Sequence, residues 1–429
     1  MNKKIKIYIP ESIPSENKGE EAILRGLIAG LKATNLDPEI CLFSYDKETD
    51  AKNYGEEVKV ITGLSYRPLR VKAKSFSQRV INSIKIWLKH IFFAIMYIIL
   101  KEKALYFFRA ENWKAYSEAD IILTGHNGCI SDLNIFFAIF CKAIKKKIII
   151  FGGGFEKFRF SVTEKLAKFV IPKIDLIVVR EKHSYNYLKS LNNSSNIFWY
   201  PDPAFLMEPC SKSDIEELFQ KENLIGVKKP LIGMIAVRGT TYYPYFYGIK
   251  DEKLRYQTHI NFFAKIIEYI IEITNGTVIF IPHCIRSALK NDDREVARDI
   301  KSKLNYYQDR VILVEEEYNA ETLKSFIGEL DFLISQRLHA VIGAATVGTP
   351  FMQLTVKQDL RSHDIIEETI GRKDLVYDLD NDDIKAFINV FEDKWNTKEE
   401  IKKYLLDKSK EIKENCYDAF KLLAKVIEK

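Results

Sequence analysis

The sequence lacks the cysteine arrangements that are typical of metal knuckles and disulfide scaffolds. Its six cysteines are scattered along 429 residues and never form a C-x-x-C pair. This spacing predicts free thiols in a reducing compartment and no metal site. The sequence also has no G-x-x-x-x-G-K-[ST] loop and no G-x-S-x-G turn. These absences exclude a P-loop nucleotidase and a serine hydrolase of the α/β type.

Signals for export and for nucleic-acid binding are also missing. The N-terminus runs from Met1 directly into an apolar strand pattern, without the long apolar core and small-residue cleavage site of a signal peptide. The net charge of +6 is too small for this length to indicate nucleic acid, and no RNP or zinc-finger motif occurs. We therefore expect a cytoplasmic protein of ordinary composition, long enough for two domains.

Short apolar runs alternate with helical patterns in both halves of the chain, which predicts an α/β fold with two Rossmann-like parallel-sheet domains. Residues 1–205 are expected to form the N-terminal domain. Residues 206–230, a region punctuated by prolines, are expected to be a hinge. Residues 231–381 then form the C-terminal domain. Residues 382–429 are charged, lack strand signals and are predicted to form C-terminal helices.

Residues 67–109 differ from the rest of the chain, because ten lysines and arginines stand there against a single acid, Glu102. Aromatic and aliphatic residues lie between the basic ones. The uninterrupted apolar run, from Ile91 to Leu100, is shorter than the roughly 20 residues that span a bilayer. A basic amphipathic helix of this kind suits an anionic membrane surface. A helical hairpin buried in the core of the first domain explains the pattern equally well.

Residues 331–356 read as a strand, a tight turn, a helix and a second strand. Ser335 is the expected N-cap, which puts Arg337 and His339 in the first helical turn. A cation there faces the positive end of the helix dipole, at a cost of a few tenths to about 1 kcal/mol. A bound anion removes that cost, because backbone N–H groups and a guanidinium converge on it. The alternative is an arginine that reaches solvent and a histidine bonded to a nearby carbonyl.

Several motifs in order resemble those of the polysaccharide pyruvyl transferase family. The set comprises Asn17-Lys18-Gly19-Glu20-Glu21-Ala22-Ile23, the segment from Asp175 to Leu188, Asp202-Pro203-Ala204-Phe205, Ile281-Pro282-His283 and Arg337-Leu338-His339-Ala340. Glu20 stands where the family usually has Asp. The resemblance implies transfer of a pyruvyl group from phosphoenolpyruvate, as co-substrate, to a sugar, with no cofactor. It also implies a fold resembling the two-domain GT-B glycosyltransferases.

The donor in such a reaction carries a phosphate and a carboxylate, so it needs two cationic sites and a group that moves a proton. We predict that Arg337 binds an anion as a planar fork and that His339 transfers the proton. Arg238, which ends another strand, is predicted as the second anion anchor. His283 and Lys357 also follow strands and are further donor-binding candidates. For each residue, a purely structural role is the alternative.

Candidate acceptor residues lie in the first half of the chain. Gly19 allows close approach of the backbone, and Glu20 beside it disfavours a phosphate and favours a sugar hydroxyl. His126 and Asn127, between two glycines, are predicted to bind sugar hydroxyls as well. The expected acceptor is a sugar of a cell-surface polysaccharide or its lipid-linked precursor, reached at the inner face of the membrane, with the oligomeric state left open.

Two other functions fit the same sequence. A GT-B glycosyltransferase that uses a nucleotide-sugar is one, because Glu321 and Glu329 have the E-x7-E spacing of some such donor sites. The other is a non-catalytic component of a polysaccharide assembly complex at the membrane surface. Stabilisation by phosphoenolpyruvate, by a UDP- or GDP-sugar, or by neither distinguishes the three.

Overall fold

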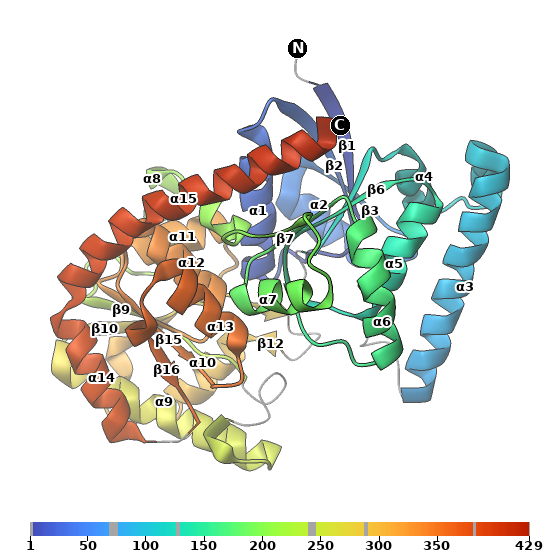
Figure 1. Ribbon diagram of the computed structural model, residues 1–429. Coiled ribbons are helices and arrows are strands. Elements are labelled where there is room, and N and C mark those ends of the chain that lie inside the picture. Colours follow the sequence, from blue (N-terminus) through green and yellow to red (C-terminus); the bar gives the residue numbers. More distant parts are fainter. Residues whose placement is uncertain are drawn as a thin grey trace. The chain divides into compact units, whose positions relative to one another are not determined.

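The computed structural model describes residues 3–67, 76–125, 129–238, 246–286, 291–380 and 383–428 (Figure 1). The chain divides into two compact units. Unit 1 comprises Met1–Ser15, Leu27–Pro203 and Asn415–Lys429. Unit 2 comprises Glu16–Gly26 and Ala204–Glu414. The short segment Glu16–Gly26 therefore clusters with the second half of the chain, and so does the proline-rich region 206–230.

Unit 1 is built on a parallel sheet in the order β3-β2-β1-β4-β6-β7-β8. Its strands are β1 (Lys3–Ile9), β2 (Leu36–Phe43), β3 (Val58–Ile61), β4 (Ile121–Thr124), β6 (Lys147–Phe155), β7 (Leu176–Val179) and β8 (Ile197–Trp199). The two-residue strand β5 (Cys129–Ile130) pairs with the end of β6. Runs such as Ile148 to Ile150 are fully buried, as expected for strands covered on both faces.

The helices of unit 1 are α2 (Lys47–Tyr54), α3 (Phe76–Leu100), α4 (Glu111–Glu118), α5 (Asp132–Ala143), α6 (Ser161–Val170), α7 (Lys182–Leu191) and the later part of α1 (Lys18–Lys32). Some of these helices have side-chain caps, such as Asp46 at the start of α2. Ser131 and Asn134 form a capping box at the start of α5. Gly152 to Gly154 lie inside strand β6, beside a bulge, and not in the tight turn that a glycine triplet favours.

Helix α3 is one continuous helix of 25 residues, not half of a helical hairpin. His90 and Phe93 on one side are completely buried, while Leu88 and Ile99 on the other side are 60% and 69% exposed. The stretch Val80–Tyr106 is long and apolar enough to cross a membrane, by length and composition alone. The apolar part of this helical region is therefore longer than the uninterrupted run from Ile91 to Leu100 suggested.

Unit 2 contains a second parallel sheet in the order β13-β10-β9-β14-β15-β16. Its strands are β9 (Leu231–Ile235), β10 (Thr277–Phe280), β13 (Val311–Leu313), β14 (Phe332–Ser335), β15 (Phe351–Thr355) and β16 (Val376–Asp378). Its helices include α8 (Lys212–Lys221), α9 (Glu252–Thr274), α10 (Asp293–Lys301), α11 (Ala320–Gly328), α12 (Leu338–Val347), α13 (Leu360–Asp364) and α14 (Ile384–Asn396). Ser211 caps α8.

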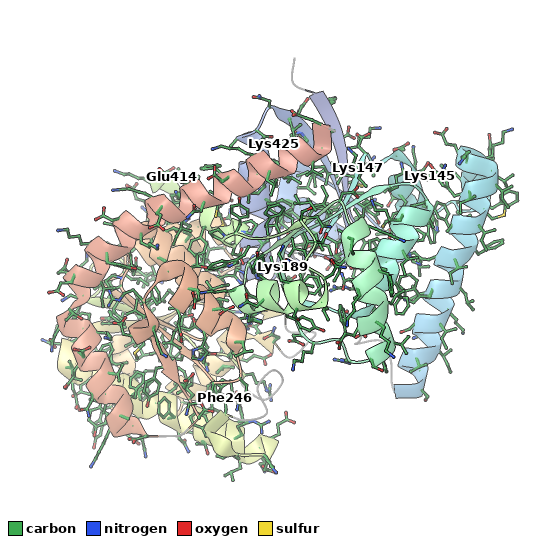
Figure 2. The ribbon with its side chains drawn as sticks, viewed as in Figure 1. Lys145, Lys147, Lys189, Phe246, Glu414 and Lys425 are labelled. Carbon is green, nitrogen blue, oxygen red and sulfur yellow. The ribbon has the colours of Figure 1, made fainter. Side chains whose placement is uncertain are left out.

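The C-terminal segment is helical, as predicted, and ends with the long helix α15 (Lys398–Glu428). The part of α15 that belongs to unit 1 packs on that unit's core, where the rings of Phe420 and Phe151 lie 4.8 Å apart. Gly30 has no side chain, and the Phe420 ring occupies the space where its Cβ would lie. Lys147 donates hydrogen bonds of 3.2 Å to the carbonyls of Val426 and Ile427 (Figure 2). This lysine satisfies the last turn of α15 and complements its dipole.

Candidate active site at the strand ends of unit 2

The four residues predicted to bind the donor, apart from His339, follow four neighbouring strands of unit 2. His283 follows β10, Arg238 follows β9, Arg337 follows β14 and Lys357 follows β15, and these strands are adjacent in the order β10-β9-β14-β15. Because the strands are parallel, their carboxyl ends share one edge of the sheet, where open α/β sheets bind ligands. The topology thus gathers all four at one edge.

Arg337 lies just before helix α12, as its N-cap, and not within the first turn. The Ser335 hydroxyl accepts from the Arg337 N–H at 2.9 Å and closes the turn. The Arg337 guanidinium donates two hydrogen bonds to the Asp293 carboxylate, from Nη2 to Oδ1 at 2.6 Å and from Nε to Oδ2 at 3.2 Å. It also donates to the Asn291 side chain at 2.8 Å. The negative group that balances Arg337 therefore comes from the chain itself, which corrects the prediction of an arginine awaiting a ligand.

Asp293 is the buried partner of this arrangement, and sequence reasoning did not identify it. It begins helix α10, is 4% exposed, and accepts the backbone N–H groups of His283 and Cys284 at 3.0 and 2.9 Å. Burial raises the pKa of its carboxyl, and Arg337 and these hydrogen bonds oppose that rise. The only local signal is an acid in the first turn of a helix, which ordinarily indicates capping.

His283 lies in a positive environment. Its side chain is 4% exposed, and its pKa is held well below the usual value by burial first and then by Arg337, His339 and Lys18. Its Nδ1 is buried and has no hydrogen-bond partner among the residues that the structure describes. His283 is therefore a neutral imidazole near pH 7, and both its burial and these three neighbours disfavour its protonation.

The segment before helix α1 brings the predicted acceptor residue Gly19 to the same place. Asn17 forms an antiparallel bridge with Cys284, and the Lys18 N–H donates to the His283 carbonyl at 3.0 Å. A Cβ on Gly19 would lie 2.7 Å from Nδ1 of His339, closer than real Cβ contacts allow. Gly19 therefore leaves the space that the His339 ring occupies.

Lys18 was not predicted as a site residue, yet it is 2% exposed and close to this cluster. Its ammonium contacts Glu317 at 3.1 Å and Glu21 at 3.4 Å. Burial raises the pKa of Glu21 to about 7, although Lys18 and Arg25 oppose that rise. Glu20 accepts a hydrogen bond of 3.1 Å from the Asn17 side chain, so part of its carboxylate fixes the turn.

Arg238 and Lys357 share the strand edge but have their own partners. Arg238 lies 3.7 Å from the Glu295 carboxylate and covers the ring of Tyr256, with its Cζ 5.0 Å from the ring centre. Lys357 is exposed, and its backbone N–H donates to Asp380 at 3.2 Å. Glu295 and Asp293 are both in the first turn of α10, so the two arginines contact the start of the same helix.

His126 and Asn127 lie outside the described residues. Within the described ranges, no three His, Cys, Asp or Glu side chains come together as metal ligands would.

One histidine that sequence reasoning missed, His363, bridges Glu367 at 3.0 Å and Asp378 at 2.9 Å. Burial lowers the pKa of His363, but the two carboxylates outweigh burial and raise it overall. An Asp or Glu four residues later in a helix is the only local signal for such a contact.

Solved structures with the same fold are numerous, at low sequence identity. The UDP-GlcNAc 2-epimerase of Neisseria meningitidis, bound to UDP-GlcNAc, has a TM-score of 0.56 at 13% identity and covers 99% of both chains. The UDP-GlcNAc 2-epimerase of Methanocaldococcus jannaschii has a TM-score of 0.52 at 11% identity, covering 91% of this chain and 92% of its own. A UDP-glucose:anthocyanidin 3-O-glucosyltransferase in complex with UDP has a TM-score of 0.52 at 10% identity and covers 100% of both. These relatives confirm the predicted GT-B-like fold.

The sequence itself identifies the family. No curated protein matches the chain. A family model does, and it is described as polysaccharide pyruvyl transferase. The match covers residues 17–357, which include Gly19, His283, Arg337 and His339. It begins at Asn17, two residues before Gly19, and ends at Lys357, two residues after strand β15. The chain belongs to the polysaccharide pyruvyl transferase family.

Proposed function

We propose that this protein transfers the pyruvyl group of phosphoenolpyruvate to two hydroxyls of a sugar, as a ketal, on a cell-surface polysaccharide or its lipid-linked precursor. The family supports pyruvyl transfer to a polysaccharide. The choice of phosphoenolpyruvate rests on one observation, which is the convergence of Lys18, Arg337 and His339 on the buried His283. A donor with a phosphate and a carboxylate fits a place where positive charge already acts on a neutral imidazole.

The reaction removes two protons from the sugar hydroxyls, and it adds one proton to the enol carbon and one to the leaving phosphate. Carbon C3 of the enol takes up a proton and becomes a methyl group, and C2 forms bonds to two sugar oxygens. The bond from C2 to the phosphate oxygen breaks, and phosphate leaves with its electron pair. The two hydroxyl protons supply the methyl proton and one proton of the departing phosphate. A general acid and base is therefore needed, but no oxidant or reductant.

We assign proton transfer to His339, because its ring lies against the turn at Gly19. Neutral His283, with Nδ1 unbonded among the described residues, is the candidate to accept a proton or bind the carboxylate. Arg337, oriented by Asp293, is assigned to a donor anion. Arg238 and Lys357 are assigned to the second anion, because their strands flank β14.

The acceptor is proposed to bind beside Gly19 and Glu20, and the roles of His126 and Asn127, which lie outside the described residues, stay a prediction. Because Gly19 borders His339, a sugar hydroxyl beside this turn is within reach of the proton-transfer group. We further propose that the reaction takes place in the cytoplasm, where phosphoenolpyruvate is available. The side chains of Cys41, Cys141, Cys210, Cys284 and Cys416 are free thiols, in keeping with that compartment.

The test is a product assay. Candidate sugar acceptors are incubated with the protein and phosphoenolpyruvate, and the ketal is measured by mass spectrometry alongside phosphate release. We expect His339→Ala to lower turnover by about 10²–10⁴-fold. Arg337→Lys should mainly raise the KM for phosphoenolpyruvate, because the ammonium keeps the charge but loses the fork. His363→Gln, in the same unit but bonded to other carboxylates, is the matched control and should keep normal turnover. Normal activity in the first two variants would refute the assignment.

A glycosyltransferase that uses a nucleotide-sugar is the second candidate, because solved structures of this fold bind UDP or UDP-GlcNAc. Its proposed donor carboxylates have other roles, however. Glu321 lies 3.6 Å from Arg25, and Glu329 is an exposed residue that ends α11. A thermal-shift measurement separates the candidates. Phosphoenolpyruvate should raise the melting temperature if pyruvyl transfer is correct, whereas a UDP- or GDP-sugar should do so for the alternative.

A further inference from the structure

Helix α3 exposes an apolar stripe along its outer side. The stripe consists of Ile81, Ile84, Leu88, Ile91, Phe92, Ile95, Ile98 and Ile99, each exposed by between 48% and 69%. Most of these positions are three or four apart, so their side chains form one continuous face of the helix. A soluble monomer rarely leaves an apolar face of this length in water, so the stripe indicates an interaction site.

The opposite side of α3 is already occupied by unit 1. His90, Phe93 and Ala94 are buried, and the Phe93 ring stacks on Trp113 with centroids 4.6 Å apart. His90 also lies 5.1 Å from the Phe140 ring of α5. A helix that crosses a membrane as a free span would have to withdraw these side chains from the core. Although Val80–Tyr106 is long enough to span a bilayer, the packing holds α3 as a one-sided helix.

The charges around the stripe identify the partner. Lys85 and Lys89 are exposed along the helix, and Lys101, Lys103 and Arg109 are exposed just after it. The one acid among residues 76–109 is Glu102. A second copy of this face would bring the lysines of both copies together, so self-association through the stripe is disfavoured. A surface that combines acyl chains with negative headgroups matches both the apolar stripe and its basic flank.

The apolar face continues onto the neighbouring helix. On α5, which packs against α3 (Figure 1), Phe136 and Ile139 are each 40% exposed. The Phe136 ring lies 6.2 Å from Trp87 of α3, so the two helices share this surface. Beyond the end of α3, Tyr106 and Phe107 are also largely exposed. Aromatic residues near a basic flank are typical of the interface between headgroups and acyl chains.

We propose that unit 1 binds an anionic phospholipid bilayer through the outer face of α3. The helix lies in the plane of the membrane, the stripe enters the boundary between headgroups and acyl chains, and Lys85 and Lys89 contact the negative headgroups. The buried side of the helix keeps its packing on unit 1. This inference rests on the exposed face alone and does not depend on which group the enzyme transfers.

The experiment measures partition of the full chain onto sedimenting vesicles in 0.1 M NaCl. One vesicle is pure phosphatidylcholine, and the other also contains phosphatidylglycerol. We expect binding to the anionic vesicles at least about tenfold stronger than to the neutral ones. Leu88→Glu combined with Ile95→Glu should abolish binding, because it places two charges in the stripe. Lys85→Gln combined with Lys89→Gln should weaken binding to the anionic vesicles on the order of tenfold and leave the neutral ones unchanged.

The matched control is Ile225→Glu, which alters an apolar side chain of unit 2 that is 69% exposed and far from α3 in sequence. It should bind vesicles as the unaltered protein does. Each variant's fold is checked by circular dichroism and by the midpoint of its urea unfolding, neither of which needs a membrane or a substrate. Equal binding to both vesicles, or unchanged binding by the stripe variant, overturns the proposal. A protein that stays in solution as a dimer, and becomes monomeric when the stripe is charged, would overturn it in favour of a second copy.

Discussion

Replacing Arg337 by Met tests the pair at the centre of the site. The substitution keeps much of the side-chain volume but removes the fork of hydrogen bonds to Asp293, which is 4% exposed. Removing one partner of a buried ion pair typically costs 3–5 kcal/mol. The Arg337 side chain is 17% exposed, so solvent partly screens the pair. We therefore expect the free energy of unfolding to fall by about 3 kcal/mol at pH 8.

The loss should depend on pH in a defined direction. The pKa of Asp293 is already raised by burial, and Arg337 is the largest influence that lowers it. Without Arg337 that pKa rises further, so the folded variant holds a proton that the unfolded chain releases. Between the two pKa values, the stability of the variant must then fall as pH rises. The cost of the substitution should be smaller at pH 5 than at pH 8.

The measurement is urea unfolding followed by fluorescence, with Trp395 reporting on unit 2, whose sequence contains no other tryptophan. The double variant Arg337→Met with Asp293→Asn completes the cycle. It removes the buried charge as well as its partner, so it should be more stable than Arg337→Met alone by about 1–2 kcal/mol. A loss below about 0.5 kcal/mol in the single variant, or no recovery in the double variant, contradicts the reasoning.

Three further outcomes follow from the same contacts. Gly19→Ala should lower turnover on the order of 10²-fold by displacing the His339 ring, with the melting temperature nearly unchanged because alanine favours a helix. His363→Gln should reduce stability most below pH 6.5 and little at pH 9. The two carboxylates stabilise the protonated His363, and this stabilisation is lost as pH rises through the raised pKa of His363. Urea unfolding at both pH values measures the difference. Glu21→Gln should gain stability relative to the unaltered protein as pH rises from 4.5 to 7. Because the pKa of Glu21 is about 7 in the folded protein, ionisation of this carboxyl destabilises the unaltered protein over that range, and glutamine cannot ionise. A difference in unfolding free energy that does not change with pH would contradict this.

Many of the strands were predictable because they are short apolar runs. The short runs Val58–Ile61, Ile121–Thr124 and Leu176–Val179, for example, are the strands β3, β4 and β7. The strand-end positions of His283, Arg238, Arg337 and Lys357 followed directly, because a residue just after a buried strand is at the sheet edge. Local patterns therefore placed the candidate donor residues correctly along the chain and at the edge.

The partners of those residues were not predictable, because they depend on contacts between distant parts of the chain. Asp293 is 44 positions from Arg337 in sequence, and no periodicity connects them. The approach of Gly19 to His339 depends on the antiparallel bridge between Asn17 and Cys284. For α3, composition could not decide which side of the helix is buried. The Trp113 and Phe140 rings that cover it come from later elements.

The case for an anion site now rests on a different residue than the sequence indicated. Arg337 is balanced by Asp293, so its charge alone does not require a ligand. His283 is not balanced in this way, because the first three charged groups that act on its ring are Arg337, His339 and Lys18, and each one disfavours its protonation. A bound anion would act on the His283 ring in the opposite direction and raise its pKa. In the proposed reaction, binding of phosphoenolpyruvate would thereby favour protonation of an imidazole that is buried and neutral in the free protein.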